Sequence, residues 1–352
     1  MTIDEMLTEP WTYLALLKGR QAEYDALREL NLAVRRRVTP LLLLREDGGP
    51  ATVAALAEQL DRLRIDWDDQ GPVILDGDWL RDPTTFRLAL EAATSKGWVA
   101  IPSARLTDPD AYVEAVRLAA AKVGAVLRLS RADFASGEIE ERLGSKLEAI
   151  GLTPERVDLV LDLRNVDWTH LGADTMAVES MIAQLPTAAR WRHLALAASS
   201  IPPDFRGFAR NEVTRVPRAE AWLYEAIFDR RKLLARLPVY ADYVVANPDP
   251  VEEVHADYLP QNALVRYSTS GDWLFARGYD INKEGSGHIP PLLSRLMKEQ
   301  GFRDASFSAG DRWIVDAASG DGASGNATIW RRAGSSHHMT LVTQQIATQF
   351  SP

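Results

Sequence analysis

Short, continuously hydrophobic segments alternate with longer amphipathic segments along most of this chain. The hydrophobic segments are 13–17, 40–44, 72–75, 98–101, 125–129, 157–163, 193–198 and 239–245. Continuous rather than alternating hydrophobicity is typical of strands that are buried on both faces. Amphipathic segments such as 52–63, with apolar residues at helical spacing, lie between them. The pattern therefore predicts an α/β fold, a TIM-barrel-like (β/α)8 domain of about eight strand–helix units.

The pattern is interrupted by a Pro- and Arg-rich connection at 201–218 and changes again after residue 247. Segments 263–268 and 272–276 flank a Thr-Ser-Gly turn and predict an inserted β-hairpin. The rest of the chain predicts a helix, a Gly- and Ser-rich loop and a short terminal helix, over 291–300, 319–326 and 339–349. We expect one barrel domain over residues 1–352, with a hairpin at 263–277 and a C-terminal segment at 327–352 as additions.

Composition excludes several classes of function. The chain has 352 residues, no Cys and a formal net charge of −9. The negative charge argues against bulk nucleic-acid binding, and the absence of Cys excludes disulfides, thiolate catalysis and Cys-ligated metals. Residues 1–10 lack the features of a signal peptide, and no apolar run approaches the length of about 20 residues that spans a membrane. We therefore expect a cytoplasmic protein without membrane segments.

Familiar cofactor and catalytic motifs are missing from the sequence. No GxGxxG follows a predicted strand, no Walker lysine loop is present, and no GxSxG elbow occurs. Neither dinucleotide binding nor nucleotide-triphosphate binding of the usual kinds is indicated. The cofactor and the metal requirement stay unknown at this stage.

Two ends of the chain carry a family resemblance. The segment Tyr13-Leu14-Ala15-Leu16-Leu17-Lys18-Gly19-Arg20, the Ala241-Asp242-Tyr243 strand and the C-terminal Trp330-Arg331, Gly334 and Ser336-His337-His338 carry it. With these residues the chain resembles the Beta protein family of bacteria and tailed phages, over nearly its whole length. The resemblance implies a setting of phage–host conflict but no particular reaction. The family usually has a small residue, often Gly, where Val244 stands here, so a tight turn at this point is in question.

Charged residues follow or end many of the predicted strands. They are Lys18, Arg45, Asp76, Asp78, Arg128, Arg131, Asp162, Arg164 and Asp242. Sites of (β/α)8 barrels lie at the carboxyl ends of the strands, so these side chains would meet at one mouth. Lys18, Arg128, Arg131 and Arg164 would bind an anion. In an enzyme the catalytic residues would be Asp76, Asp162 and Asp242, as acid, base or metal ligand, and Lys18, which would stabilise developing charge. The alternative is an ion-pair network that only closes the top of the barrel.

Five residues nearer the C-terminus and in the hairpin are further ligand-binding candidates. His337 or His338 could reach the mouth, although neighbouring helical side chains point about 100° apart and seldom share a metal. Trp330 and Arg331 could stack on a ligand, or the Trp could seal the lower end of the barrel. Arg277 could contact a ligand from the hairpin, or simply mark the exit of the hairpin.

Two functions remain open from the sequence. In the first, the charged mouth binds, and could hydrolyse, a small anionic or phosphorylated ligand. In the second, the barrel is a scaffold without catalytic activity that binds a protein partner. The scaffold hypothesis predicts an occluded mouth and an exposed aromatic patch on the hairpin, the 201–218 connection and the C-terminal segment, with Trp222, Trp273 and Tyr258 as candidates.

Overall fold

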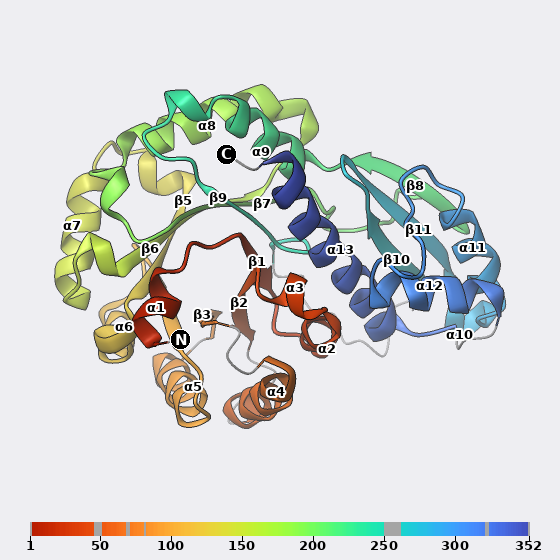
Figure 1. Ribbon diagram of the computed structural model, residues 1–352, viewed down its shortest axis with the longest axis horizontal. Coiled ribbons are helices and arrows are strands. Elements are labelled where there is room, and N and C mark those ends of the chain that lie inside the picture. The colour runs from red at the N-terminus through yellow and green to blue at the C-terminus, as the bar shows by residue number, and fades with distance from the viewer. Residues whose placement is uncertain are drawn as a thin grey trace.

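Eight parallel strands form a closed barrel in the computed structural model, which describes residues 2–45, 51–67, 71–80, 82–249, 262–320 and 324–350 (Figure 1). The barrel order is β1-β2-β3-β4-β5-β6-β7-β9. The strands are β1 Tyr13–Leu17, β2 Val38–Arg45, β3 Val73–Trp79, β4 Ala100–Arg105, β5 Ala125–Ser130, β6 Val157–Asn165, β7 Leu194–Ser199 and β9 Val239–Asp242. Each one lies within or overlaps a predicted hydrophobic segment, so the predicted (β/α)8 fold is confirmed.

Helices cover the outside of this barrel (Figure 1). They are α2 Gln21–Glu29, α3 Leu32–Arg35, α4 Ala51–Trp67, α5 Pro83–Ser95, α6 Asp110–Val123, α7 Ile139–Ile150, α8 Leu171–Gln184 and α9 Ala219–Asp229. An additional short helix, α1 Ile3–Thr8, precedes the first strand. Leu7 of α1 and the following Trp11 pack into the barrel interior, where the Trp11 ring stacks on His193 with a centroid distance of 4.5 Å.

Strand side chains alternate between the barrel interior and the helical layer. The interior cluster takes every second residue of the strands and includes Leu14, Leu16, Leu41, Leu43, Ile74, Ile101, Val126, Val160, Ala241 and Tyr243. The intervening residues pack outward against the helices. Both faces of each strand are thus buried, which is the physical reason for continuous hydrophobic segments in the sequence.

A second, three-stranded antiparallel sheet stands beside the barrel (Figure 1). The predicted hairpin is present as β10 Asn262–Ser268 and β11 Asp272–Asp280. Its third strand, β8 Glu212–Pro217, comes from the 201–218 connection, where the sequence predicts no strand. The segment around β8 is rich in proline and arginine, and the residues of the strand are at most half-buried. The strand therefore lacks the continuous hydrophobic run that marks the barrel strands. Helices α10 Ile281–Glu284, α11 Ile289–Leu296 and α12 Ala309–Ser319 follow β11.

Helix α13, Ala327–Gln349, joins the two sheets and is far longer than the predicted 339–349 helix. It packs against α2 on the barrel side and against β10 and α12 on the other side. A Cβ atom at Gly334 would lie 2.4 Å from the carbonyl oxygen of Arg266, so only glycine lets the helix approach β10 this closely. The polar Ser-Ser-His-His stretch is therefore the middle of a buried helix.

Candidate functional site

Arg128 links two carboxylates inside the mouth of the barrel. Its guanidinium lies 2.9 Å from Asp76 and 2.6 Å from Asp162. Ser103 donates to Asp76, and the Tyr243 hydroxyl donates to Asp162 over 2.7 Å. All five side chains are buried. The structure therefore brings Asp76, Arg128 and Asp162 together as predicted, and places them in one ion-pair and hydrogen-bond network.

Charge pairing decides the ionisation of this network. Burial by itself would raise the pKa of Asp76, but the nearby Arg128 and Arg105 guanidinium groups outweigh it and lower that pKa. Burial and the Asp162 carboxylate raise the pKa of Tyr243 well above its ordinary value. Asp76 is thus a carboxylate and Tyr243 a neutral phenol at neutral pH. In this arrangement Arg128, Ser103 and Tyr243 bind the buried carboxylates of Asp76 and Asp162. This is the ion-pair network that the sequence analysis gave as the alternative.

A second group of mouth residues is nearer the solvent. Arg164 donates through Nε and Nη2 to Asp249 Oδ1, at 3.2 and 2.7 Å, and Asn165 donates to Asp249 Oδ2 at 2.6 Å. Lys18 Nζ lies 2.7 Å from the main-chain oxygen of Asp249. The side chains of Arg164 and Asp249 are 34% and 49% exposed, so this ion pair can exchange with solutes. The mouth thus holds an anionic group among cationic and amide donors.

The backbone turns sharply after both Asp162 and Asp242. Arg164 and Val244 have φ values of 57° and 54°, the left-handed region that disfavours residues with a side chain. In each case the main-chain N–H donates to the Oδ1 atom of the aspartate two residues earlier. The tight turn that Val244 puts in question is therefore present, held by Asp242.

Asp242 lies on the outer surface of the barrel wall, away from Asp76 and Asp162, and this corrects its predicted place in the mouth. Strand side chains alternate, and Tyr243 occupies the interior, so Asp242 must point outward. There it accepts hydrogen bonds from Tyr13 at 2.5 Å and Tyr240 at 3.0 Å. His338 Nε2 lies 2.7 Å from its Oδ2 atom.

His338 completes a buried Ser–His–Asp chain. Its Nδ1 atom lies 2.9 Å from Ser268 Oγ, and its Nε2 atom faces Asp242. Burial lowers the pKa of His338, so the ring is neutral, donates to Asp242 and accepts from the serine hydroxyl. The order of contacts is that of a catalytic triad, but all three side chains are buried. A substrate has no path to Ser268 Oγ here, so we assign these contacts to the joining of α13, β9 and β10.

His337 serves the second sheet. Its Nδ1 atom lies 2.8 Å from Asp311 Oδ2, its Nε2 atom lies 2.8 Å from the Ser268 carbonyl oxygen, and its ring stacks on Tyr267 at 3.8 Å. The ring thus bridges α12 and the main chain of β10. Neither histidine reaches the barrel mouth, which differs from the functional alternative of the sequence analysis.

The remaining candidates lie apart from one another. Trp330 is buried in the apolar core of the second sheet, away from both ends of the barrel, and donates to the Ser324 carbonyl. Arg277 donates to the carbonyl oxygens of Arg206 and Phe208. Arg331 is half-buried on α13. The side chains of Arg45 and Asp78 lie outside the described residues.

Arg131 lines a pocket at the carboxyl ends of β6 and β7. It pairs with Asp174 at 2.8 Å, and the pocket of about 760 Å³ also contains Trp168 and Asp167. Two carboxylates against one guanidinium make this pocket a poor place for an anion. Arg131 is therefore already neutralised by Asp174 and is a poor candidate for the predicted anion contact.

The prediction that Trp273 belongs to an exposed aromatic patch is wrong, because its side chain is only 1% exposed and its indole N–H donates to Glu220. Trp222 is half-buried, and Tyr258 lies outside the described residues.

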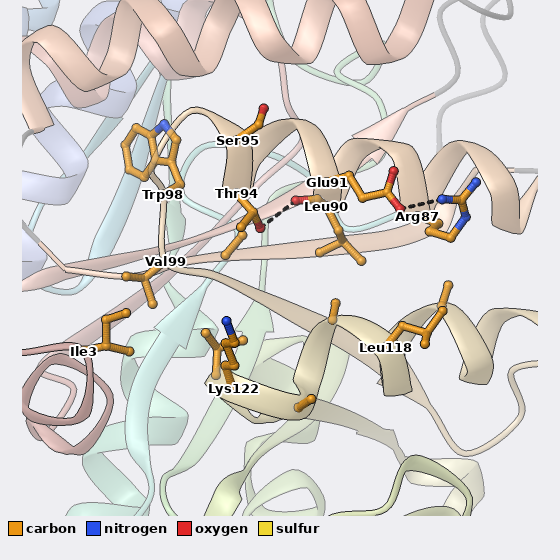
Figure 2. A pocket seen from close by; sticks show the side chains of 15 residues that line it. Ile3, Arg87, Leu90, Glu91, Thr94, Ser95, Trp98, Val99, Leu118 and Lys122 are labelled. Carbon is orange, nitrogen blue, oxygen red and sulfur yellow. Dashed lines mark hydrogen bonds and ion pairs between the residues drawn. The ribbon is translucent and has the colours of Figure 1, made fainter.

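An apolar groove of about 640 Å³ lies between α5 and α6 (Figure 2). Ile3 and Leu118, 50% and 55% exposed, flank it together with Val99, which precedes β4. It therefore lies at the amino-terminal end of the barrel, opposite the charged mouth.

Sequence reasoning missed several mouth residues, above all Tyr243, Ser103, Asn165 and Asp249. The alternation of side chains along a strand could have placed Tyr243 inside the barrel once Asp242 was placed outside. No local sequence pattern indicates that Asp249 contacts residues of β6.

Among the described residues, no three His, Asp or Glu side chains gather closely enough to hold a metal ion. None of the helices in the described ranges combines the length and apolarity needed to cross a bilayer.

The fold and mouth define a (β/α)8-barrel protein with an attached three-stranded sheet. A family model described as Beta protein matches residues 13–344. The chain therefore belongs to the Beta protein family, which confirms the resemblance seen at its two ends. No curated protein matches the chain.

Solved structures similar to the chain include three enzymes. A type I 3-dehydroquinate dehydratase from Clostridium difficile is 10% identical, with 68% of this chain and 88% of that one covered and a TM-score of 0.41. A triosephosphate isomerase from Bartonella henselae is 14% identical, with coverage of 66% and 92% and a TM-score of 0.35. The enoyl reductase domain of MlnA from Bacillus amyloliquefaciens is 9% identical, with coverage of 73% and 60% and a TM-score of 0.38. The closed order of the eight strands itself establishes the barrel.

Proposed function

We propose that this protein binds a small anionic ligand at the mouth of the barrel, at the carboxyl ends of β1 and β6. One observation carries the proposal: Arg164, Asn165 and Lys18 already hold an anionic residue, Asp249, at a half-exposed position. Arginine and amide donors in this geometry suit a carboxylate, and a ligand of that class can replace the internal one.

The proposal is binding without hydrolysis. Asp76 and Asp162 are buried and bound to Arg128, so neither is positioned to take a proton from water at the mouth. Arg128 contributes by holding the floor of the mouth rigid. Its two ion pairs leave the more exposed Arg164 as the ligand-facing cation, with the buried Lys18 behind it at the main chain of Asp249.

Isothermal titration calorimetry with succinate and citrate at low salt tests the proposal. We expect millimolar or tighter binding that Arg164→Gln weakens at least about tenfold, since it removes a charge-assisted hydrogen-bonded pair. Asp249→Asn should tighten binding by removing the internal competitor. Arg190→Gln, an exposed ion-pair residue outside the mouth, is the matched control. Absence of binding, or equal binding by Arg164→Gln and Arg190→Gln, would contradict the proposal.

The family's occurrence in bacteria and tailed phages supports a role in phage–host conflict, with the bound anion as a signal in the cytoplasm. Phage plating on cells that express the protein tests this role. A protective or sensitising effect should disappear with Arg164→Gln and persist with Arg190→Gln.

A further inference from the structure

The apolar groove between α5 and α6 has a regular origin in the sequences of the two helices (Figure 2). Four lining residues of each helix recur at intervals of three and four positions, which places them on one face of that helix. They are Arg87, Leu90, Glu91 and Thr94 on α5, and Ala115, Leu118, Ala119 and Lys122 on α6. Two of the four on α6 are alanines, whose short side chains leave space between the helices.

The wall of the groove is apolar. Leu90, Trp98 and Ala100 line its buried side, and Ile3 and Leu118 stand half-exposed at its rim. Contact of such a surface with water is unfavourable, so a ligand that covers it gains the free energy of apolar burial. The volume of about 640 Å³ is also within the range of about 300–1,000 Å³ that is usual for small-molecule sites.

Lys122 brings a positive charge into this apolar groove. Figure 2 shows its ammonium group in the space between the two helices. Within the described part of the chain, Lys122 makes no ion pair or hydrogen bond. Arg87, by contrast, pairs with Glu91 one turn further along α5. The lining residues therefore leave one cation uncompensated, and an anionic group on a ligand would complement it.

The hydroxyl groups of the groove already donate within α5. Thr94 donates to the Leu90 carbonyl oxygen over 2.9 Å, and Ser95 donates to the Ala92 carbonyl oxygen over 2.8 Å. A peptide or a nucleotide would lose water from many polar groups here and gain few partners for them. The groove thus suits a ligand with an apolar body and one anionic group.

We propose that the groove binds a single-chain fatty carboxylate, with its acyl chain between α5 and α6 and its carboxylate at Lys122. Charge complementarity at Lys122 selects the anionic head, and the apolar wall selects the chain. The groove lies at the end of the barrel opposite the charged mouth and shares no residue with it. This site therefore goes beyond the function proposed for the mouth.

Isothermal titration calorimetry with octanoate and decanoate, below their micelle concentrations, tests the site. Decanoate should bind roughly tenfold tighter than octanoate, because each further CH2 group that is buried tightens binding roughly fourfold. Lys122→Gln should weaken decanoate binding about threefold, the size of effect expected for an exposed ion pair. Lys283→Gln, at an exposed lysine of α10, is the matched control and should change nothing.

A second variant fills the groove. Ala119→Leu places a larger side chain between the helices and should weaken decanoate binding at least about tenfold. Leucine is a good helix former, so the helix should be kept, and circular dichroism checks this. Ala111→Leu, at an exposed position of the same helix outside the groove, is its control and should bind decanoate like the wild type.

The proposal is overturned if neither carboxylate binds, if both bind equally well, or if Ala119→Leu and Ala111→Leu bind decanoate equally. Unchanged binding by Lys122→Gln would overturn the placement of the carboxylate. If Ala119→Leu changed the mass measured by sedimentation but not decanoate binding, the groove would be an interface between two copies of the chain instead. Succinate binding at the mouth should be the same in all four variants, so failure of either proposal is visible separately.

Discussion

His338 Nε2 lies 2.7 Å from Asp242 Oδ2, and this contact ties the C-terminal helix α13 to the outer surface of barrel strand β9. The two residues are 96 positions apart in the chain. Asp242 also accepts from Tyr13 and Tyr240 and holds the turn at Val244. One carboxylate therefore connects the first strand, the last barrel strand and the helix that carries the second sheet.

Asp242→Asn should destabilise the protein strongly. Burial raises the pKa of Asp242 and its partners, led by His338, more than offset this, so the native state contains a carboxylate. Its removal leaves buried donors poorly satisfied and should lower the free energy of unfolding by roughly 3 kcal/mol. Urea unfolding followed by circular dichroism measures the change. The same substitution at exposed Asp229 is the control, and equal midpoints would contradict the prediction.

Arg128→Met should be destabilising even though methionine has a suitable shape. Asp76 and Asp162 would each keep a buried negative charge without its partner, which typically lowers stability by roughly 3–5 kcal/mol. Adding Asp76→Asn and Asp162→Asn removes those charges and should recover part of the loss. Denaturant titration measures the free energies of unfolding of the single and the triple variant. A triple variant less stable than the single one would show that the unpaired charges are not the cause.

The stability of the protein should fall in two stages as the pH is lowered. The pKa of His338 is depressed in the folded protein, so below about 6.5 the unfolded chain takes up this proton first and becomes favoured. Asp76 and Asp242 also have lowered pKa values, so their contribution is present above about 3.9 and is lost as the pH falls further. Melting temperatures between pH 8 and 3 measure both stages. His338→Gln should flatten the slope below pH 6.5 and also reduce the acid stage, because His338 leads the interactions that lower the pKa of Asp242; the contribution of Asp76 to that stage should remain. An unchanged slope below pH 6.5 would refute the assignment.

Arg266→Met should stabilise the protein in buffer without multivalent anions. The substitution removes a poorly compensated charge and keeps the apolar contact with Phe205, which should raise the free energy of unfolding by roughly 1 kcal/mol. Urea unfolding followed by circular dichroism measures the change. A large loss of stability on Arg266→Met would speak for an ordinary structural role.

We propose that residues 1–352 unfold as one cooperative unit. Helix α13 packs on α2 through the Arg332–Glu29 ion pair and on β10 through Gly334, so neither sheet is complete without it. Scanning calorimetry should show a single transition, with His338→Gln leaving it single at a lower temperature. Two separate transitions in the wild type would define the three-stranded sheet as a domain of its own.

The barrel could be predicted from the sequence because its signal is local. A strand buried on both faces must be hydrophobic throughout, and the segments at 13–17 and 157–163 show this directly. The hairpin at β10 and β11 is also local, since its turn lies between adjacent strands. Strand β8 pairs with β11 from more than 50 residues away and is exposed on one face, so its sequence carries no comparable signal.

The amino-acid sequence by itself determined which charged residues end the barrel strands, and so brought Asp76, Arg128 and Asp162 to one place. Only the tertiary structure decided how each side chain is used. A shift of one position along a strand reverses the direction of a side chain, which is why Asp242 faces α13 while Tyr243 faces Arg128. The partners of His337 and His338, and the Phe205 ring beneath Arg266, come from elements far away in the chain, so no local pattern encodes these contacts.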